Sequence, residues 1–277
     1  MAAPRWRRAG GIAAALAAAG LGWGAFEAGW VRLRVLELEV PGLPPQLDGL
    51  RVAHLSDFHL GVPSRGARAV EVAVDWVAAR GADLVCVTGD LLTHPRGEPF
   101  LRELVVRLPR PAFAVLGNHD VAVSRDPQAR ASNLSELEPA RLLRDEGELV
   151  ELGGRSVWIA GTDPRPSLRG RLRVDPGSLS READFRILLS HFPRAFDRIE
   201  PERFDLVLSG HMHDGQITVP YPGGKLRLAH LSARYPGGVY RSRAGVMHVS
   251  PGLGTTFVPF RFAARPEVTE LVLRSPA

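Results

Sequence analysis

Five short groups of metal-ligating residues, each at or just after an apolar run, constrain this chain more than any other feature. They run in order Asp57-Phe58-His59, Gly89-Asp90, Gly117-Asn118-His119-Asp120, Ser190-His191 and Gly210-His211-Met212-His213. A single Asp-x-His or His-x-His pair carries little information, because such pairs are common on protein surfaces. Five groups of carboxylates, imidazoles and one amide, all at predicted strand ends, indicate a two-metal hydrolytic site.

The apolar runs themselves predict an α/β fold. Strands are expected over residues 52–56, 84–88 and 112–116, and helices over residues 67–80 and 98–108. This alternation indicates a largely parallel sheet with helices on its faces, and in such sheets ligands bind beyond the carboxyl ends of the strands. Residues 31–40 alternate between apolar and charged side chains with a slip at Val35-Leu36, which predicts a half-exposed strand with a bulge.

The second half of the chain has a different pattern of predicted elements, with strands and turns in place of alternating strands and helices. Short apolar runs separated by Gly and Pro turns predict strands over residues 157–160, 185–189, 206–208, 217–219, 225–228, 246–250 and 268–273. They are expected to form a second, more antiparallel sheet packed face to face with the first. The single cysteine, Cys86, lies inside the run at 84–88 and is predicted to be a buried small hydrophobe.

The N-terminus is expected to lie outside the folded domain, which divides the chain into residues 1–30 and 31–277. Three arginines precede an uncharged Ala- and Gly-rich stretch over residues 9–26. Its length just reaches that of a membrane span, roughly 18 residues. A signal anchor is the favoured interpretation, ahead of a cleaved signal peptide, a twin-arginine signal or a helix lying in the membrane interface.

Charge argues against a nucleic-acid partner. The formal net charge is +5, but the basic residues are almost all arginine and are scattered along the chain. No stretch combines basic and aromatic residues as a single-strand-binding groove does. A solvated basic surface accounts for most of this charge.

The sequence resembles the calcineurin-like metallophosphoesterases, including a membrane-anchored bacterial subgroup with UDP-2,3-diacylglucosamine hydrolases of lipid A biosynthesis. The matching stretches are SDFHLG, VTGDLL, VLGNHD, LSHFP and LSGHMHDGQ, and the tail VSPGLGTTFVPFRFAARPEV resembles one subgroup. The resemblance implies a four-layer αββα sandwich of two mixed sheets, with two divalent metal ions (Mn, Fe or Zn, with Mn favoured) at the sheet edge.

The resemblance also implies roles for individual residues. Asp57, His59 and His213 would hold the first metal, Asn118, His191 and His211 the second, and Asp90 would bridge them. A metal-bridging hydroxide would attack phosphorus, and His119, which is not a ligand, would act as general acid on the leaving oxygen. Asp120 is expected to order its loop.

Three positions depart from the pattern of the family. Many relatives have an aspartate three residues after the bridging one, to orient the catalytic histidine, where this chain has Thr93. Asp214 is an added carboxylate beside the metal ligands and is expected to point to solvent. Pro251 stands where relatives often have arginine, so one phosphate contact is expected to be missing.

These observations predict a metallophosphoesterase that cleaves a phosphodiester or pyrophosphate bond, with a lipid-linked substrate favoured. Two alternatives are a broad-specificity phosphodiesterase or phosphomonoesterase on soluble extracytoplasmic substrates, and a metal-binding scaffold without activity. The expected location is the bacterial inner membrane. The arginines before the apolar stretch weakly favour an extracytoplasmic domain, whereas a UDP-linked substrate requires the cytoplasmic side.

Overall fold

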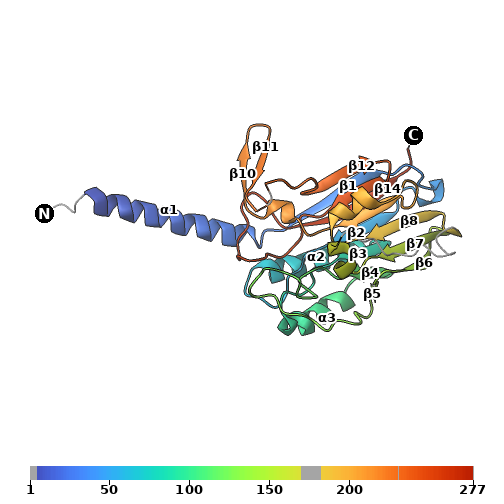
Figure 1. The fold of residues 1–277 in the computed structure, drawn as a ribbon, viewed down its shortest axis with the longest axis horizontal. Coiled ribbons are helices and arrows are strands. Elements are labelled where there is room, and N and C mark those ends of the chain that lie inside the picture. Colours follow the sequence, from blue (N-terminus) through green and yellow to red (C-terminus); the bar gives the residue numbers. More distant parts are fainter. Residues whose placement is uncertain (1–4, 170–181, 230, 277) are drawn as a thin grey trace.

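The computed structural model describes residues 5–169, 182–229 and 231–276. In this part of the chain two six-stranded mixed sheets pack against each other, and helices cover the outer face of the first sheet (Figure 1). The α/β fold with two mixed sheets predicted from the sequence is therefore confirmed.

The first sheet contains the predicted βαβ units. Its strands, in spatial order, are β1 (Arg32–Glu39), β14 (Glu267–Arg274), β2 (Arg51–Leu55), β3 (Leu84–Thr88), β4 (Ala112–Val115) and β5 (Arg141–Leu142). Strands β2 to β5 are parallel, as predicted. The helices α2 (Gly66–Arg80) and α3 (Glu98–Val106) connect them, and α2 ends at Gly81, whose φ of 62° is left-handed.

Two predictions for this sheet are wrong. Strand β1 pairs with β14 in unbroken register from Arg32 to Glu39, so it has no bulge at Val35-Leu36. The slip in alternation is tolerated because β1 is an edge strand whose two faces are mostly exposed. Strand β14 was expected in the second sheet, but it lies between β1 and β2 in the first.

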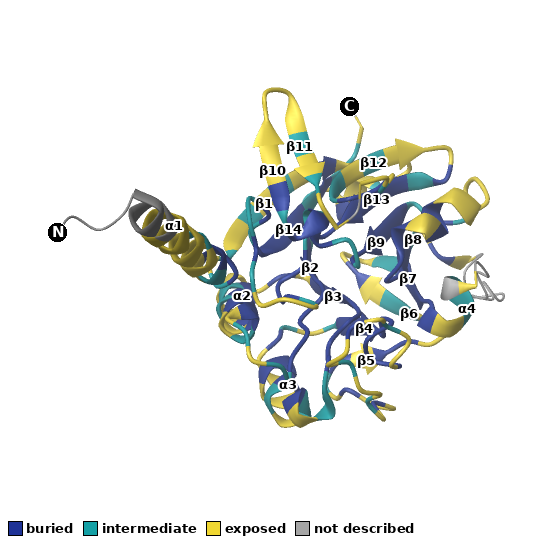
Figure 2. Ribbon diagram, turned by 60° about the vertical axis from the view of Figure 1, so that its left-hand side comes forward, coloured by how far each residue is buried: buried dark blue, intermediate teal, exposed yellow. Residues whose placement is uncertain are grey.

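The second sheet has parallel central strands and antiparallel edges. Its order is β12 (Gly238–Ser242), β13 (Gly245–Val249), β9 (Leu206–Ser209), β8 (Phe185–Leu189), β7 (Arg155–Gly161) and β6 (Glu146–Leu152). The runs predicted at 217–219 and 225–228 do not join this sheet. They form a separate hairpin, β10 (Thr218–Tyr221) and β11 (Gly224–Arg227), which projects from the domain (Figure 2).

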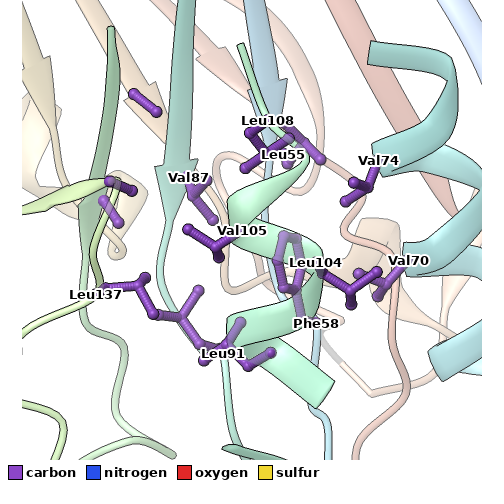
Figure 3. Packing of buried hydrophobic residues seen from close by; sticks show 14 of the residues in the cluster. Leu55, Phe58, Val70, Val74, Val87, Leu91, Leu104, Val105, Leu108 and Leu137 are labelled. Carbon is purple, nitrogen blue, oxygen red and sulfur yellow. The ribbon is translucent and has the colours of Figure 1, made fainter. Parts of the chain in front are cut away.

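Two layers of apolar side chains hold these elements together. Between the sheets, Cys86 and Phe113 of the first pack with Ile187 and Leu208 of the second, so Cys86 is buried as predicted. On the outer face of the first sheet, leucines and valines of α2 and α3 pack on β2 and β3 (Figure 3). Among the described residues, the outer face of the second sheet is covered in part by the 3₁₀ segment Pro193–Arg198.

The N-terminal helix α1 (Arg5–Glu27) extends away from the domain (Figure 1). Residues 1–4 of the predicted N-terminal segment lie outside the described residues. Within the described ranges, we find no helix with both the length and the apolar character needed to cross a membrane. A membrane-spanning N-terminal helix is therefore not confirmed.

Candidate active site

The strand ends bring all eight predicted site residues to one edge of the double sheet. Three strands of the first sheet, β2, β3 and β4, are followed by Asp57, Asp90 and Asn118-His119. His59 also follows β2. In the second sheet, β8 is followed by His191, and β9 by His211 and His213. Every one of these side chains is buried except that of His211, which is half-buried.

One set of ligand atoms converges from Asp57, His59, Asp90 and His213. The Nε2 atoms of His59 and His213 are 3.0 Å apart. Asp57 Oδ1 lies 3.4 Å from His213 Nε2, and Asp90 Oδ2 lies 3.6 Å from His59 Nε2. Three of these side chains were predicted to share the first metal, with Asp90 as the bridge.

A second set converges around His191. Its Nε2 atom lies 3.2 Å from Asp90 Oδ2, 3.2 Å from Asn118 Oδ1 and 3.2 Å from His211 Nδ1. Asp90 Oδ2 therefore belongs to both sets of ligand atoms, which is the position that a bridging carboxylate requires.

These distances fit divalent metal ions. Ligands about 2.0–2.2 Å from a metal lie roughly 3.0–3.6 Å from their neighbours in octahedral or tetrahedral geometry, a range that includes the distances given above. In the first set, His59 Nε2 and Asp57 Oδ1 lie farther apart, at 4.0 Å. Nitrogen and oxygen donors without thiolate suit Mn, Fe or Zn better than Ca or Mg. Three clusters of carboxylate and imidazole groups could hold metal ions: Asp57, His59 and His213; His59, Asp90 and His119; and Asp90, His191 and His211. His119, which was predicted not to be a ligand, thus lies within ligand distance of one cluster.

The backbone at this edge is held in a conformation that non-glycine residues rarely adopt. Five of the predicted ligands have a positive φ, between 48° and 72°: Asp57, His59, Asp90, His211 and His213. Left-handed geometry costs of order 1 kcal/mol for each such residue. Backbone hydrogen bonds from Asp57 N to Gly89 O and from His59 N to Asp90 O hold two of these turns in place. Backbone strain of this kind is common at functional sites, because it directs side chains to positions that an unstrained strand end could not reach.

Two motif glycines allow the loops to approach the carboxylates. A Cβ atom at Gly117 would overlap the carboxylate of Asp90, and one at Gly210 would overlap Ser56 and Asp57. The absence of a side chain at Gly210 lets the next residue approach Asp57, and His211 N donates to both of its carboxylate oxygens, at 3.0 and 3.1 Å. The glycines that precede Asn118 and His211 are therefore required by packing around the ligands.

Electrostatics keep three of the groups, His59, His213 and Asp90, in protonation states that suit metal binding. Burial lowers the pKa of His59 and His213 well below the ordinary value, which favours the neutral ring that coordinates metals. Burial raises the pKa of Asp90, but the surrounding imidazoles, His191 foremost, outweigh it and hold the pKa well below the ordinary value. Asp90 is therefore ionised over the whole physiological pH range. For two others the shift is opposite: burial raises the pKa of Asp57 to about 6, and although burial lowers the pKa of His191, the charge of Asp90 outweighs this effect and raises that pKa to about 9.

Asp120 orders its loop, as predicted. Its buried carboxylate accepts hydrogen bonds from the backbone N–H groups of Leu91 (3.1 Å), Leu92 (2.7 Å) and Gly117 (2.8 Å). These bonds tie the loop after β3 to the loop after β4, and so fix Asp90 relative to Asn118.

Thr93 contacts a predicted metal ligand and not the histidine predicted to be catalytic. Its Oγ1 lies 2.9 Å from His59 Nδ1, and both residues are buried. A proton on Nδ1 that is donated to this hydroxyl leaves the Nε2 lone pair directed at the metal position. The position that departs from the family pattern thus acts on His59.

Replacing Thr93 with Val is expected to weaken metal binding by about 10–100-fold, the usual effect of removing the partner of a ligating histidine. Thr93→Ser keeps the hydroxyl and is the matched control. Titration of metal-free protein with Mn²⁺, followed calorimetrically, measures the difference. Equal affinities for the Val and Ser variants would show that the hydroxyl does not orient His59.

His119 is held by residues far from position 93. Its Nε2 atom lies 3.0 Å from Ser124 Oγ and 3.3 Å from Thr256 Oγ1. The hydroxyl of Thr256 donates to the buried carboxylate of Asp126 at 3.1 Å, and Phe257 N donates to the same oxygen at 2.9 Å. Sequence reasoning missed this arrangement because its parts lie in two irregular loops with no motif.

Asp214 is not directed at solvent, so that prediction is wrong. Its carboxylate accepts from Lys225 Nζ at 2.9 Å and from Arg227 Nε at 3.0 Å. Both cations belong to β11, so Asp214 attaches the base of the β10–β11 hairpin beside His213. The pairing also neutralises the added carboxylate next to the predicted metal ligands.

A buried arginine connects His213 to the N-terminal helix. Arg261 is completely buried, and its Nη2 atom lies 3.1 Å from His213 Nδ1. The same loop is bonded to the last turn of α1, because Arg261 N donates to Gly24 O at 3.1 Å and Ala264 N donates to the Glu27 carboxylate at 2.9 Å.

Comparison with known proteins places this site in a family. The profile of the Calcineurin-like phosphoesterase family matches residues 50–215, which contain every predicted ligand. An uncharacterized metallophosphoesterase of Aquifex aeolicus is 32% identical over 257 residues, 88% of this chain and 92% of that protein. The transmembrane protein with metallophosphoesterase domain of Danio rerio is 31% identical over 87% of this chain and 57% of its own length. Phosphodiesterase YaeI of Escherichia coli is 28% identical over 59% of this chain and 58% of that protein.

Proposed function

This chain belongs to the calcineurin-like phosphoesterase family of hydrolases, and we propose that it is a phosphodiesterase that requires two divalent metal ions and prefers lipid-linked substrates. The observation that carries the two-metal proposal is the position of Asp90 Oδ2. It lies within 3.6 Å of His59 Nε2 and within 3.2 Å of His191 Nε2, and so belongs to both sets of ligand atoms.

The roles of the residues follow from these two sets. Asp57, His59 and His213 would hold one ion, and Asn118, His191 and His211 the other, with Asp90 between them. Bound at such a pair of sites, divalent ions polarise phosphoryl oxygens and lower the pKa of water to about 7. The strained backbone turns keep the ligands aimed at these positions before substrate arrives.

His119 is suited to act on the leaving oxygen. Its ring packs edge-on against that of His59, with 4.5 Å between centroids, which places it beside the first set of ligands. Its Nε2 atom is engaged by two hydroxyls, whereas its Nδ1 atom is buried and has no hydrogen-bond partner among the described residues. A proton on Nδ1 would be donated to the leaving oxygen as the P–O bond breaks.

Asp126 would orient the His119 ring, and so the proton on its Nδ1 atom, through the hydroxyl of Thr256. Because the Thr256 hydroxyl donates to Asp126, its oxygen is free to accept from His119 Nε2–H. Thr256→Val, which keeps the shape of the side chain, is expected to lower kcat about 10-fold for alkyl-ester substrates and to leave metal content unchanged. Thr256→Ser should restore the rate. An equal loss on p-nitrophenyl and alkyl esters would show that Thr256 does not act through His119.

Two exposed apolar features favour a lipid-linked substrate. The described part of α1 exposes Ile12, Leu16, Leu21, Trp23 and Phe26, and the β10–β11 hairpin with the residues that follow it exposes Val219, Tyr221, Leu226, Leu228 and Leu231. Their bases meet at Phe262, which lies close to Gly24 of α1 and whose carbonyl accepts from Thr218 N at 2.9 Å. Because Asp214 joins the hairpin to the ligand loop, a membrane surface that contacts both features would lie close to the metal centre.

Product analysis of the Mn-loaded protein with α1 retained tests this function. The enzyme is offered bis-p-nitrophenyl phosphate and, in mixed micelles, UDP-2,3-diacylglucosamine. Hydrolysis of both, with UMP and the lipid monophosphate as products, is expected. Hydrolysis of bis-p-nitrophenyl phosphate alone would support phosphodiesterase activity but not the lipid-linked substrate. It would favour the second candidate, a broad-specificity enzyme for soluble esters, which agrees with the name of the Escherichia coli relative, Phosphodiesterase YaeI. Hydrolysis of neither would overturn the proposal.

A further inference from the structure

A cleft of about 330 Å³ opens beside the metal centre, next to His211. It is distinct from the ligand cluster, because only His211 belongs to both. Its lining combines cationic, hydroxyl and apolar side chains: Ser167, Phe192, Pro193, Arg194, Arg198, His211 and Met212.

No described residue neutralises the charge of the two arginines that line the cleft. Arg194 and Arg198 lie on the 3₁₀ segment Pro193–Arg198, both are exposed, and neither has an ion pair or hydrogen bond to another described residue. The one carboxylate of that segment, Asp197, is engaged elsewhere. It accepts from Arg234 at 2.8 Å and from the Tyr235 hydroxyl at 2.7 Å. The cleft therefore has two guanidinium groups that remain available for an anion.

A hydroxyl group in the cleft also indicates an anionic ligand. Ser167 Oγ is buried, lines the cleft and has no hydrogen-bond partner among the described residues. A buried polar atom without a partner is rare in folded proteins, because it loses its bonds to water and gains none in return. A phosphate oxygen placed between the arginines and this hydroxyl would supply the bond.

The remaining wall is apolar and leads to the metal ligands. The ring of Phe192 packs edge-on against the rings of His211 and His191, with centroids 4.7 and 5.0 Å apart. Met212 follows His211 directly and lines the same cleft. A ligand can therefore place an uncharged body against Phe192 and Met212 while one end reaches His191 and His211.

We propose that this cleft binds the part of the substrate next to the scissile phosphorus, and that this part carries a second anionic group. The proposal rests on the proposed function and narrows its substrate class to pyrophosphate diesters, or diesters with an adjacent phosphate. Hydrolysis of such a pyrophosphate adds the oxygen of water to one phosphorus and breaks its bond to the bridging oxygen, which yields two phosphomonoesters. Arg194 and Arg198 bind the phosphate that is not attacked.

Substitution of both arginines separates this role from general catalysis. The double variant Arg194→Ala/Arg198→Ala is compared with the wild type on UDP-glucose, a soluble pyrophosphate diester, and on bis-p-nitrophenyl phosphate, which has no second anionic group. We expect kcat/KM for UDP-glucose to fall about 30–100-fold, mainly through KM, since each charged hydrogen bond contributes a few-fold to tenfold. Hydrolysis of bis-p-nitrophenyl phosphate should change less than about twofold.

The matched control is Arg68→Ala/Arg243→Ala, which removes the same charge from exposed positions outside the cleft. It should leave both activities unchanged. An equal loss on both substrates, or the same loss in the control, would overturn the role of the cleft. So would a wild-type enzyme that cleaves bis-p-nitrophenyl phosphate but neither cleaves nor is inhibited by UDP-glucose. Failure of the wild type on bis-p-nitrophenyl phosphate would instead count against the proposed function itself.

Discussion

Replacement of Asp90 with Ala is expected to reduce phosphoesterase activity below detection and to lower the bound metal from two ions to one or fewer. Asp90 Oδ2 lies 3.6 Å from His59 Nε2 in one set of ligand atoms and 3.2 Å from His191 Nε2 in the other. Its loss removes the shared negative charge that allows two cations to lie close together. Metal content by mass spectrometry and hydrolysis of bis-p-nitrophenyl phosphate measure the two effects.

Two further variants make this result specific. Asp90→Asn keeps the volume beside Gly117 and removes the charge, so it separates loss of charge from collapse of the loop. Asp75→Ala removes an exposed carboxylate from α2 and should behave as the wild type. Near-normal activity of Asp90→Ala with a full metal content would contradict the bridging assignment and, with it, the two-metal proposal.

Removal of the His119 side chain should lower activity without the loss of bound metal that is expected for Asp90→Ala. His119→Ala is expected to lower kcat about 10²–10⁴-fold on substrates with poor leaving groups while both metal ions are retained. The reason is geometric: His119 lies beside His59 and Asp90, with which it could share an ion, but the two proposed sets of ligands are complete without it. The loss should shrink for p-nitrophenyl esters, whose leaving oxygen needs no proton.

The dependence on leaving group decides the role of this residue. A series of aryl phosphodiesters with increasing leaving-group pKa is measured for the wild type and for His119→Ala, and the variant should show the steeper decline. Parallel declines would show that His119 positions the substrate without donating a proton. A lower metal content in the variant would show that it is a ligand.

The candidate metal centre was the most predictable part of this protein. Its predicted ligands come at or shortly after the ends of short apolar runs, and the carboxyl ends of parallel strands meet at one sheet edge. Asp57 and Asp90 could therefore be placed near each other from the sequence, and the structure brings their carboxylates and the histidines together. Strands with a strong apolar run, such as β3 and β8, were placed correctly for the same reason.

Features that depend on contacts between distant, irregular segments could not be predicted. Strand β14 lies between β1 and β2, which are more than 190 residues away along the chain, and nothing in its apolar pattern indicated these neighbours. Likewise, Thr256 and Asp126 meet at His119 because two loops pack together, and neither loop has a periodic pattern. The association of Thr93 with His59 was missed because family resemblance assigned position 93 to another histidine.

The attachment of α1 to the Arg261 loop limits how this protein could be matured. Shortening the chain as far as Trp23 would leave the bonds of Gly24 and Glu27 to that loop intact. A cut after Ala28 would delete both bonds and loosen the support of Arg261, the partner of His213. A chain that begins after Ala28 is therefore expected to be less active than one that begins at Gly24, which keeps both bonds to the Arg261 loop.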